Sequence, residues 1–459
     1  MSQPWSQPLS SAPSELSAFG RYLILTAAFL GWAFSGFQMA VMTLVAPSAT
    51  AEFQRSGQVS EYKVFRLDRL AVAPSLPTIP PPASAEAAAA RKKFEGLWFS
   101  WYNAAFLFGA AAGGLVFGWM GDWLGRVRAM GASIFCFSFF SGLGYFAATP
   151  EQLLLLRVLS GMGVGGMWPT GVALASEAWS DASRPMIAGL LGTSANVGLV
   201  FLNTLGYFWP PMPESWRWLL LVCAAPLVLA ILVWLFLPES RLWLAARRSV
   251  AGGKPGVTMA TVFQPPLLRL TLIGIAVGTI PILGGWGATQ WLIPWTKSVV
   301  SQTNPEAMAL TAIMRSGGAI IGGLAGGWIA SLAGRRLTYF MVSLASLAIG
   351  EYIFLVLTPG DATFWTWVFI LGMVSTIFFG WLPLYLPELF PTEARSTGAG
   401  VSFNSGRILA AFGVLGAGLI TAAFGGDYGR AGSITTLVYA LGMVIILFAP
   451  DTTKSKLSK

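Results

Sequence analysis

The 459-residue chain has no histidine, only two cysteines and few charged residues. Without histidine it cannot build a histidine-ligated zinc site, a Ser-His-Asp triad or a histidine proton relay. Cys136 and Cys223 both fall inside apolar runs, so we expect packing roles rather than a disulfide framework or a metal site. The sequence also lacks a Gly-x-Ser-x-Gly elbow and a Walker-type phosphate loop. We therefore expect no enzyme activity, no metal and no cofactor.

Charge is scarce in proportion to apolar content. Charged residues make up 10% of the chain and hydrophobic residues 55%, and the mean hydropathy is +0.66. A soluble domain carries about 25% charged residues, whereas a membrane span needs about 20 apolar residues in a helix that satisfies its own backbone. The sequence predicts an all-α integral membrane protein with about twelve transmembrane helices. The net charge of +9 comes mostly from loops beside spans, which indicates topology signals rather than a nucleic-acid site.

The apolar runs divide the chain into two bundles. The twelve expected spans cover residues 21–46, 96–118, 130–148, 151–173, 185–207, 216–237, 267–294, 308–330, 337–357, 364–386, 397–422 and 434–448. We expect a cytoplasmic tail over 1–20, a six-helix bundle over 21–237 with an external loop over 47–95, a cytoplasmic linker over 238–266, a second six-helix bundle over 267–449, and a cytoplasmic tail over 450–459. The N-terminus lacks the features of a cleaved signal peptide, so the first span is expected to be retained. Basic residues favour both termini inside, against a single external cluster at 91–93.

Two polar patterns occur twice. Gly118, Asp122, Gly125 and Arg126 correspond to Gly327, Ser331, Gly334 and Arg335, each 209 residues later. Glu177 and Arg184 correspond in the same way to Glu388 and Arg395, each 211 residues later. The chain therefore consists of two related halves.

The pattern Gly-x-x-x-Asp-x-x-Gly-Arg-x-Arg, which spans residues 118–128, resembles the signature loop of the major facilitator superfamily of secondary transporters. The resemblance implies two pseudo-symmetric six-helix bundles, the major facilitator fold, and a cytoplasmic charge cluster that latches the outward-facing state. The expected gating residues are Asp122, Arg126, Arg128, Glu177, Arg184, Arg335, Glu388 and Arg395. The alternative is a positive-inside turn with helix-capping glycines and ordinary loop charges.

Four charged residues fall inside expected spans: Arg157, Arg315, Glu351 and Arg407. A charge at the bilayer centre costs at least about 2.5–3.5 kcal/mol, so each calls for an explanation. Arg157 precedes spaced glycines and resembles the family's span-four pattern, which implies a coupling or structural role; the alternative is snorkelling to the outer surface. Arg407 lies in an Asn-x-Gly-Arg run that resembles span eleven of the organic-acid branches, including sialate and monocarboxylate symporters.

A substrate carboxylate would suit Arg315, because a guanidinium group binds a carboxylate through two parallel hydrogen bonds. The alternative is a structural pair between Arg315 and Glu351. Relatives of the organic-acid branches tend to carry acids where this chain has Ser35 and Gln38, so Glu351, with Arg157, is the candidate for proton coupling. The expected substrate-binding residues are Arg315, Arg407, Asn404, Asn103, Gln290 and Tyr385.

These features favour a secondary active transporter of a small organic anion, a monocarboxylate or sugar acid, with proton symport by alternating access. We expect a monomeric, multi-pass protein of the plasma membrane, a bacterial inner membrane, whose partners are the organic acid, protons and lipid, with no nucleic acid. A neutral sugar or drug facilitator is the first alternative, because Pro238-Glu239-Ser240-Arg241 resembles the run after span six of sugar facilitators. A non-transporting membrane sensor is the second.

Overall fold

The structure, a computed structural model, describes residues 16–57, 85–179, 184–249, 259–300 and 307–453, in which all regular elements are helices. The first half contains α1 (Ala18–Gly57), α2 (Ala85–Trp123), α3 (Arg126–Leu143), α4 (Pro150–Ala178), α5 (Arg184–Phe208), α6 (Trp218–Ala224) and α7 (Leu227–Phe236). Helix α8 (Arg241–Ser249) follows. The second half contains α9 (Leu267–Val300), α10 (Ala307–Ala333), α11 (Arg335–Leu355), α12 (Phe364–Leu389), α13 (Arg395–Asn404), α14 (Gly406–Ala423), α15 (Tyr428–Thr436) and α16 (Val438–Ile445). Short 3₁₀ turns lie at Gly144–Phe146, Met259–Phe263, Thr392–Ala394 and Ile446–Phe448.

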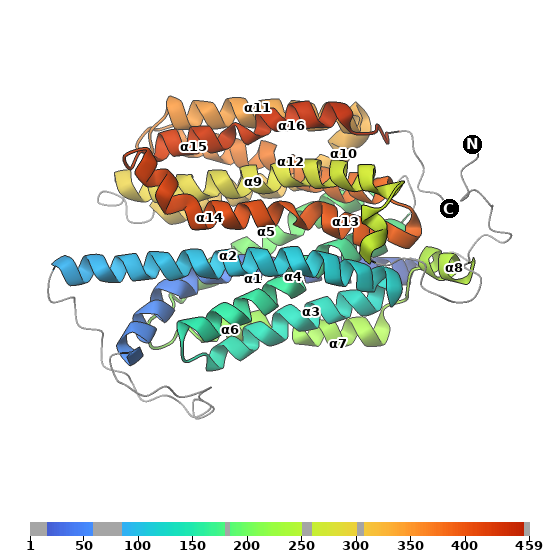
Figure 1. The fold of residues 1–459 in the computed structure, drawn as a ribbon, viewed down its shortest axis with the longest axis horizontal. Helices are drawn as coiled ribbons and strands as arrows, with labels where there is room; N and C mark the ends of the chain where they lie inside the picture. Colours follow the sequence, from blue (N-terminus) through green and yellow to red (C-terminus); the bar gives the residue numbers. More distant parts are fainter. Residues whose placement is uncertain (1–15, 58–84, 180–183, 250–258, 301–306, 454–459) are drawn as a thin grey trace.

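The helices form two bundles that lie side by side (Figure 1). Helix α2 of the first half packs along α13 and α14 of the second, and α5 packs along α10 and α12. In the described residues, 11 helical segments are long and apolar enough to cross a membrane, with α6 and α7 counted as one segment and α15 and α16 as another. The remaining span is α13 with α14, which is interrupted at Ser405. The expected all-α fold of two six-helix bundles is confirmed.

The expected external loop over 47–95 is wrong at both ends. Helix α1 continues through Pro47 to Gly57, and α2 already begins at Ala85. A proline removes one backbone hydrogen bond but does not end a helix that other contacts support. Here the turns after Pro47 bury Ala49 and Phe53 against the first bundle. The rest of that loop, 58–84, lies outside the described residues.

Prolines inside two helices leave a backbone carbonyl without its helical N–H donor, and a side chain from another helix donates to that carbonyl instead. Because Pro169 has no N–H, the Gly165 carbonyl of α4 loses its helical donor; instead it accepts a 3.0 Å bond from Nδ2 of Asn404, on the opposite half. In α9, Pro281 frees the carbonyl of Val277, four residues earlier, which accepts a 2.8 Å bond from the Tyr339 hydroxyl. Both bonds satisfy buried backbone groups that have no access to water.

Replacing Tyr339 with phenylalanine should lower the melting temperature of the purified protein. The change leaves the Val277 carbonyl buried without a side-chain donor, which costs about 1–3 kcal/mol. Differential scanning fluorimetry in detergent measures the shift. Tyr207→Phe is the control: the Tyr207 side chain is exposed, so the melting temperature of this variant should equal that of the unmodified protein. Equal melting temperatures for Tyr339→Phe and the unmodified protein would contradict this role.

Glycine lets two helix pairs approach closely, at equivalent places in the two halves. A Cβ at Gly113 of α2 would lie 1.9 Å from the Met162 carbonyl of α4. A Cβ at Gly322 of α10, 209 residues later, would lie 1.8 Å from the Met373 carbonyl of α12. Small residues at such crossings are typical of packed membrane helices. The internal repeat therefore extends from the loops into the spans.

Candidate functional site

Two polar regions of the molecule contain most of the expected site residues. The first lies where α2 ends and α3 begins, at the end of the bundle that carries α8, which we call the linker end (Figure 1). Gly125 and Gly334 adopt positive φ angles of 113° and 91° directly before α3 and α11, which allows a tight turn between spans. The buried ionic groups around these turns form the gate cluster: Asp122, Arg126, Glu177, Arg184, Glu239, Arg335, Glu388 and Arg395.

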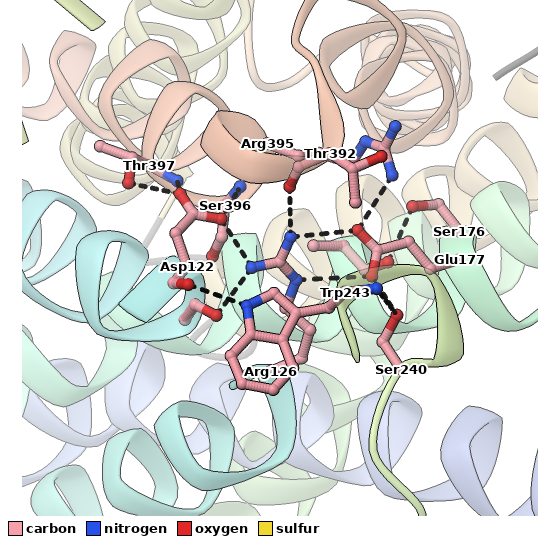
Figure 2. A network of polar contacts seen from close by, with 12 residues as sticks. Asp122, Arg126, Ser176, Glu177, Ser240, Trp243, Thr392, Arg395, Ser396 and Thr397 are labelled. Atoms are coloured by element: carbon pink, nitrogen blue, oxygen red, sulfur yellow. Dashed lines mark hydrogen bonds and ion pairs between the residues drawn. The ribbon is translucent and has the colours of Figure 1, made fainter. Parts of the chain in front are cut away.

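Arg126 is the centre of the gate cluster (Figure 2). It is 0% exposed, and its guanidinium donates to the Gly121 carbonyl at 2.7 Å and to Asp122 Oδ1 at 2.6 Å. It also donates to both carboxylate oxygens of Glu177, at 3.2 and 3.4 Å, and to the Thr392 carbonyl of the second half at 2.6 Å. All five N–H bonds of the guanidinium are therefore used. Arg126 links its own half to the other half.

Asp122 caps a helix of the opposite half. Its carboxylate accepts from the backbone N–H of Ser396 at 3.2 Å and of Thr397 at 2.7 Å, in the first turn of α13, and also from the Thr397 hydroxyl (Figure 2). A carboxylate at a helix N-terminus satisfies free N–H groups and is favoured by the helix dipole.

The equivalent position in the second half is Ser331, and the equivalent of Ser396 is Pro185, in the first turn of α5. Proline has no N–H to satisfy. The second repeat therefore lacks both the acid and one of the two backbone donors; the equivalent of Thr397 is Met186, which keeps its N–H but has no hydroxyl.

An arginine of each half pairs with a glutamate of the other half. Arg395 of the second half donates to Glu177 of the first at 2.9 Å, and Arg184 of the first half lies 3.9 Å from Glu388 of the second. Within the second half, Arg335 binds Glu388 at 2.9 Å. The gate cluster contains four carboxylates and four guanidinium groups, so its charges balance. These contacts hold the linker ends of the two halves together.

A third repeated pattern supplies residues that the sequence analysis missed. Glu239 accepts from the backbone N–H of Arg126 at 3.0 Å and of Val127, and so caps α3. Burial raises the pKa of the Glu239 carboxyl, while these backbone donors and the Arg126 charge act in the opposite direction.

A residue next to Glu239 and its counterparts in the second half form equivalent hydrogen bonds to the gate cluster. The Ser240 hydroxyl donates to Glu177, and the Thr452 hydroxyl donates to Glu388 at 2.6 Å. Thr453 accepts from the Arg335 backbone N–H at 3.0 Å. The signal was present in the sequence, because Pro238-Glu239-Ser240 corresponds to Pro450-Asp451-Thr452, 212 residues later.

Arg128, expected in the gate, is not brought into the cluster. Its side chain is exposed, and the described residues provide it with no ion-pair partner. Trp243 of α8 takes part instead, because its indole N–H donates to the Asp122 carbonyl at 2.8 Å. This bond fastens α8 to the end of α2.

The second polar region surrounds Arg407, in the first turn of α14. Its side chain is 4% exposed, and its Nη1 atom has no hydrogen-bond partner in the described part of the chain. The guanidinium lies 5.3 Å from the ring centroid of Phe403. Phe403 stacks on Trp168 of the first half at 4.1 Å, with Trp32 edge-on at 6.2 Å. Arg407 is therefore a buried cation beside an aromatic cluster that joins both halves.

Arg315 contacts helix α9, and the backbone just before Arg407 packs against the same helix. Arg315 is half-buried and donates to the Gly285 carbonyl at 3.0 Å. Gly406, which precedes Arg407, packs so closely on Thr279 that a Cβ would lie 2.7 Å from the Thr279 Cα. Thr279 and Gly285 are six residues apart in α9, which corresponds to about 9 Å along the helix axis. The backbone that carries Arg407 therefore meets α9 about 9 Å along the helix from the carbonyl that Arg315 binds.

The alternative pairing of Arg315 with Glu351 is not present. One Glu351 oxygen accepts from the Ser433 hydroxyl of α15, and the other has no partner in the described residues. Among the described acidic groups, none forms an ion pair with Arg315 or Arg407. The two guanidinium charges therefore lack a carboxylate within the described chain.

The remaining expected residues are dispersed. Asn404 is fully buried; Nδ2 bonds the Gly165 carbonyl and Oδ1 has no partner in the described residues. Asn103 donates to the Phe99 carbonyl at 2.9 Å, within its own helix. The Tyr385 hydroxyl donates to the Pro450 carbonyl at 2.8 Å, close to the gate cluster and away from Arg407. The side chain of Gln290 lies outside the described residues. Arg157 lies in the first half, with its Nη2 atom 3.0 Å from the Gln38 carbonyl.

A further buried ion pair at the opposite end was not expected from the sequence. Glu52, on the extension of α1, pairs with Arg217 and accepts from the Trp216 indole N–H at 2.8 Å. Arg217 also donates to the carbonyls of Tyr145 and Ala147, after α3. This group fastens α1, α3 and α6 together. Its partners lie 165 residues apart, and no repeat indicated them.

Comparisons with known proteins agree with this architecture. The sequence pattern of the Major Facilitator Superfamily matches residues 64–414. A cis,cis-muconate transport protein of Acinetobacter baylyi is 30% identical over 359 residues, 75% of this chain and 83% of that protein. A gallate transporter of Pseudomonas putida is 26% identical over 428 residues, 86% of this chain and 84% of that protein.

Solved structures show the same fold. The proton:xylose symporter XylE, bound to 6-bromo-6-deoxy-D-glucose, matches with a TM-score of 0.70 at 15% identity, over 96% of this chain and 98% of that chain. The human organic anion transporter MFSD10 matches with a TM-score of 0.66 at 15% identity, over 93% of this chain and 99% of that chain.

Proposed function

Because the chain belongs to the major facilitator superfamily, we propose that it carries a small organic anion across a membrane by alternating access of a site between its halves. The chain is a multi-pass membrane transport protein rather than an enzyme. The observation that carries the choice of an anion is Arg407, a buried guanidinium without a carboxylate partner in the described residues. A substrate carboxylate would supply the missing charge and a bidentate partner.

The neighbours of Arg407 favour a flat, conjugated acid. The Phe403 ring lies beside the guanidinium, and Trp168 and Trp32 pack on Phe403. Such rings stack on a planar π-system more favourably than on a puckered sugar. Muconate and gallate, the substrates named for two relatives, are both conjugated carboxylates. We place the substrate carboxylate on Arg407, with Arg315 and the free Oδ1 atom of Asn404 as further polar contacts.

The gate cluster would act as the closed gate of one transport state. We propose that the linker end is cytoplasmic, as the basic residues of the linker favour, so that the described conformation is closed to the cytoplasm. Opening would break the Asp122 cap on α13, the Arg395–Glu177 pair and the Asn404–Gly165 bond together. All three contacts join opposite halves.

Proton symport is a separate proposal, carried by Glu351. Its carboxylate lies inside α11; one oxygen accepts from the Ser433 hydroxyl, and the other has no hydrogen-bond partner in the described residues. Arg157, the other expected coupling residue, lies in the opposite half and does not contact it.

Glu351→Gln should abolish the stimulation of uptake by an imposed inward proton gradient, because glutamine cannot bind the proton. Exchange of labelled for unlabelled substrate at equal pH should persist. Ser433→Ala, which keeps the carboxyl group, is the matched control and should remain gradient-dependent. Uptake that keeps its full gradient dependence in Glu351→Gln would exclude this coupling role.

Transport itself is tested with the purified protein in proteoliposomes. A thermal-shift screen of conjugated carboxylates, saturated carboxylates, neutral sugars and amines identifies a ligand, since ligands stabilise the state they bind. Uptake of the best ligand is then measured. Preferred uptake of a conjugated acid supports the proposal. Uptake of a neutral sugar instead would favour a sugar facilitator, and tight binding without flux would favour a sensor.

A further inference from the structure

The first half contains a buried arginine, Arg157, that belongs neither to the gate cluster nor to the proposed substrate site. Arg157 of α4 is 3% exposed and lies with its guanidinium 4.4 Å from the ring centroid of Phe106. Its Nη2 atom donates to the Gln38 carbonyl, but its Nε and Nη1 atoms have no hydrogen-bond partner in the described residues. A cation removed from water with unsatisfied N–H groups is strongly disfavoured unless another group compensates it.

The neighbouring polar side chains do not supply that compensation. Both polar atoms of the Gln38 amide already have a partner, because Nε2 donates to the Cys223 carbonyl and Oε1 accepts from the Ser141 hydroxyl. The described acidic side chains form no ion pair with Arg157. Arg157 therefore carries an isolated positive charge among neutral groups.

A small pocket adjoins this charge. It is lined by Phe140, Ser141, Gly144, Leu153, Leu156, Arg157, Ser160 and Leu220. Two of these residues carry hydroxyl groups, and the Ser160 hydroxyl makes only a 3.2 Å bond to the Arg157 carbonyl of its own helix. A hydroxyl hydrogen rotates, so Ser160 can donate into the pocket. The other side chains are apolar and would exclude a large, hydrated or multivalent anion.

The pocket lies towards the end opposite the gate cluster. Arg157 is seven residues after the start of α4, or about 10 Å along the helix, and Gly144 begins the turn that follows α3. The buried Glu52–Arg217 pair binds the same turn, because Arg217 donates to the carbonyls of Tyr145 and Ala147. An occupant would therefore enter from the side opposite the linker end.

We propose that this pocket binds a small monovalent inorganic anion, chloride, held by the Nε–H and Nη1–H groups of Arg157 and the Ser160 hydroxyl. The anion neutralises Arg157 and ties α4 to α3 and α6, whose residues line the pocket. It is separate from the substrate carboxylate, which we place on Arg407 in the other half.

The test is the melting temperature of the purified full-length protein in sodium chloride and in sodium gluconate at equal ionic strength. Chloride should raise the melting temperature by a few degrees in a saturable manner, since a ligand that binds only the folded state stabilises it. Arg157→Gln should abolish this dependence, because it removes both charge and donors. Arg407→Gln should retain it, which distinguishes this pocket from chloride binding at the proposed substrate site.

A second variant keeps the test informative if Arg157→Gln does not fold. Ser160→Val retains the arginine, removes the hydroxyl and adds volume to the pocket wall, and should weaken the chloride response at least tenfold in half-saturating concentration. Equal melting temperatures in chloride and gluconate would overturn the proposal. So would a chloride response that survives in Arg157→Gln or is lost in Arg407→Gln.

Discussion

Replacing Arg407 with glutamine should reduce the efficiency of substrate uptake about 100-fold, because the carboxylate loses a bidentate, charge-assisted contact worth about 3 kcal/mol. The stability of the protein should not fall, since the change removes a buried charge that has no carboxylate partner in the described residues. The measurement is the initial rate of uptake in proteoliposomes against substrate concentration, beside the melting temperature of the same preparation.

Two further variants separate charge from geometry. Arg407→Lys keeps the charge but loses the planar fork, so it should retain intermediate uptake. Arg128→Gln removes an exposed arginine outside the gate cluster and should leave uptake unchanged. Normal uptake by Arg407→Gln would refute the placement of the carboxylate and, with it, the main support for an anionic substrate.

The repeated loop patterns predicted more of the structure than the composition of any single span. Both copies of the loop, Gly-x-x-x-Asp in the first half and Gly-x-x-x-Ser in the second, and both Glu-Arg pairs meet in one cluster, because the repeat places equivalent residues at equivalent helix ends. Arg128 did not follow, because a residue two positions after Arg126 points away from the turn that buries its neighbour. The sequence pattern alone does not distinguish the two arginines.

Contacts between distant polar side chains were less predictable. The depth of Arg315 and Glu351 in their spans could be read from the sequence, but not the faces on which they lie; Glu351 faces α15, and Arg315 faces α9. Asn404 was expected beside a ligand, yet Nδ2 binds a carbonyl freed by Pro169 in the other half. Proline positions were visible in the sequence, but the helix that satisfies each freed carbonyl depends on packing.

The largest conformational effect should come from Glu177→Gln. This carboxylate neutralises Arg126 within its own half and Arg395 from the other half, and all three side chains are at most 1% exposed. Removing its charge leaves two buried guanidinium groups undercompensated, and breaking a buried ion pair costs about 3–5 kcal/mol. The conformation closed at the linker end should be destabilised by that amount relative to the conformation in which this end is open to water. The equilibrium between the two conformations should therefore shift towards the open one by about 100-fold or more.

The shift can be measured as a distance between spin labels on the two halves at the linker end. Suitable sites are Arg128→Cys on α3 and Leu332→Cys on α10, both exposed, in a protein whose Cys136 and Cys223 are replaced by serine. Glu177→Gln should move the distance distribution to longer values. Glu151→Gln, an exposed acid at the other end of the same helix, should leave it unchanged.

The equivalent change in the second half provides a graded comparison, because the two repeats are not equally tight. Glu388 is 3.9 Å from its partner across the interface, Arg184, whereas Glu177 is 2.9 Å from Arg395. The second repeat also has Ser331 at the position where the first repeat has Asp122, the acid that caps α13. Glu388→Gln should therefore lengthen the distance less than Glu177→Gln. An equal or larger effect of Glu388→Gln would mean that the first repeat does not dominate the closed state.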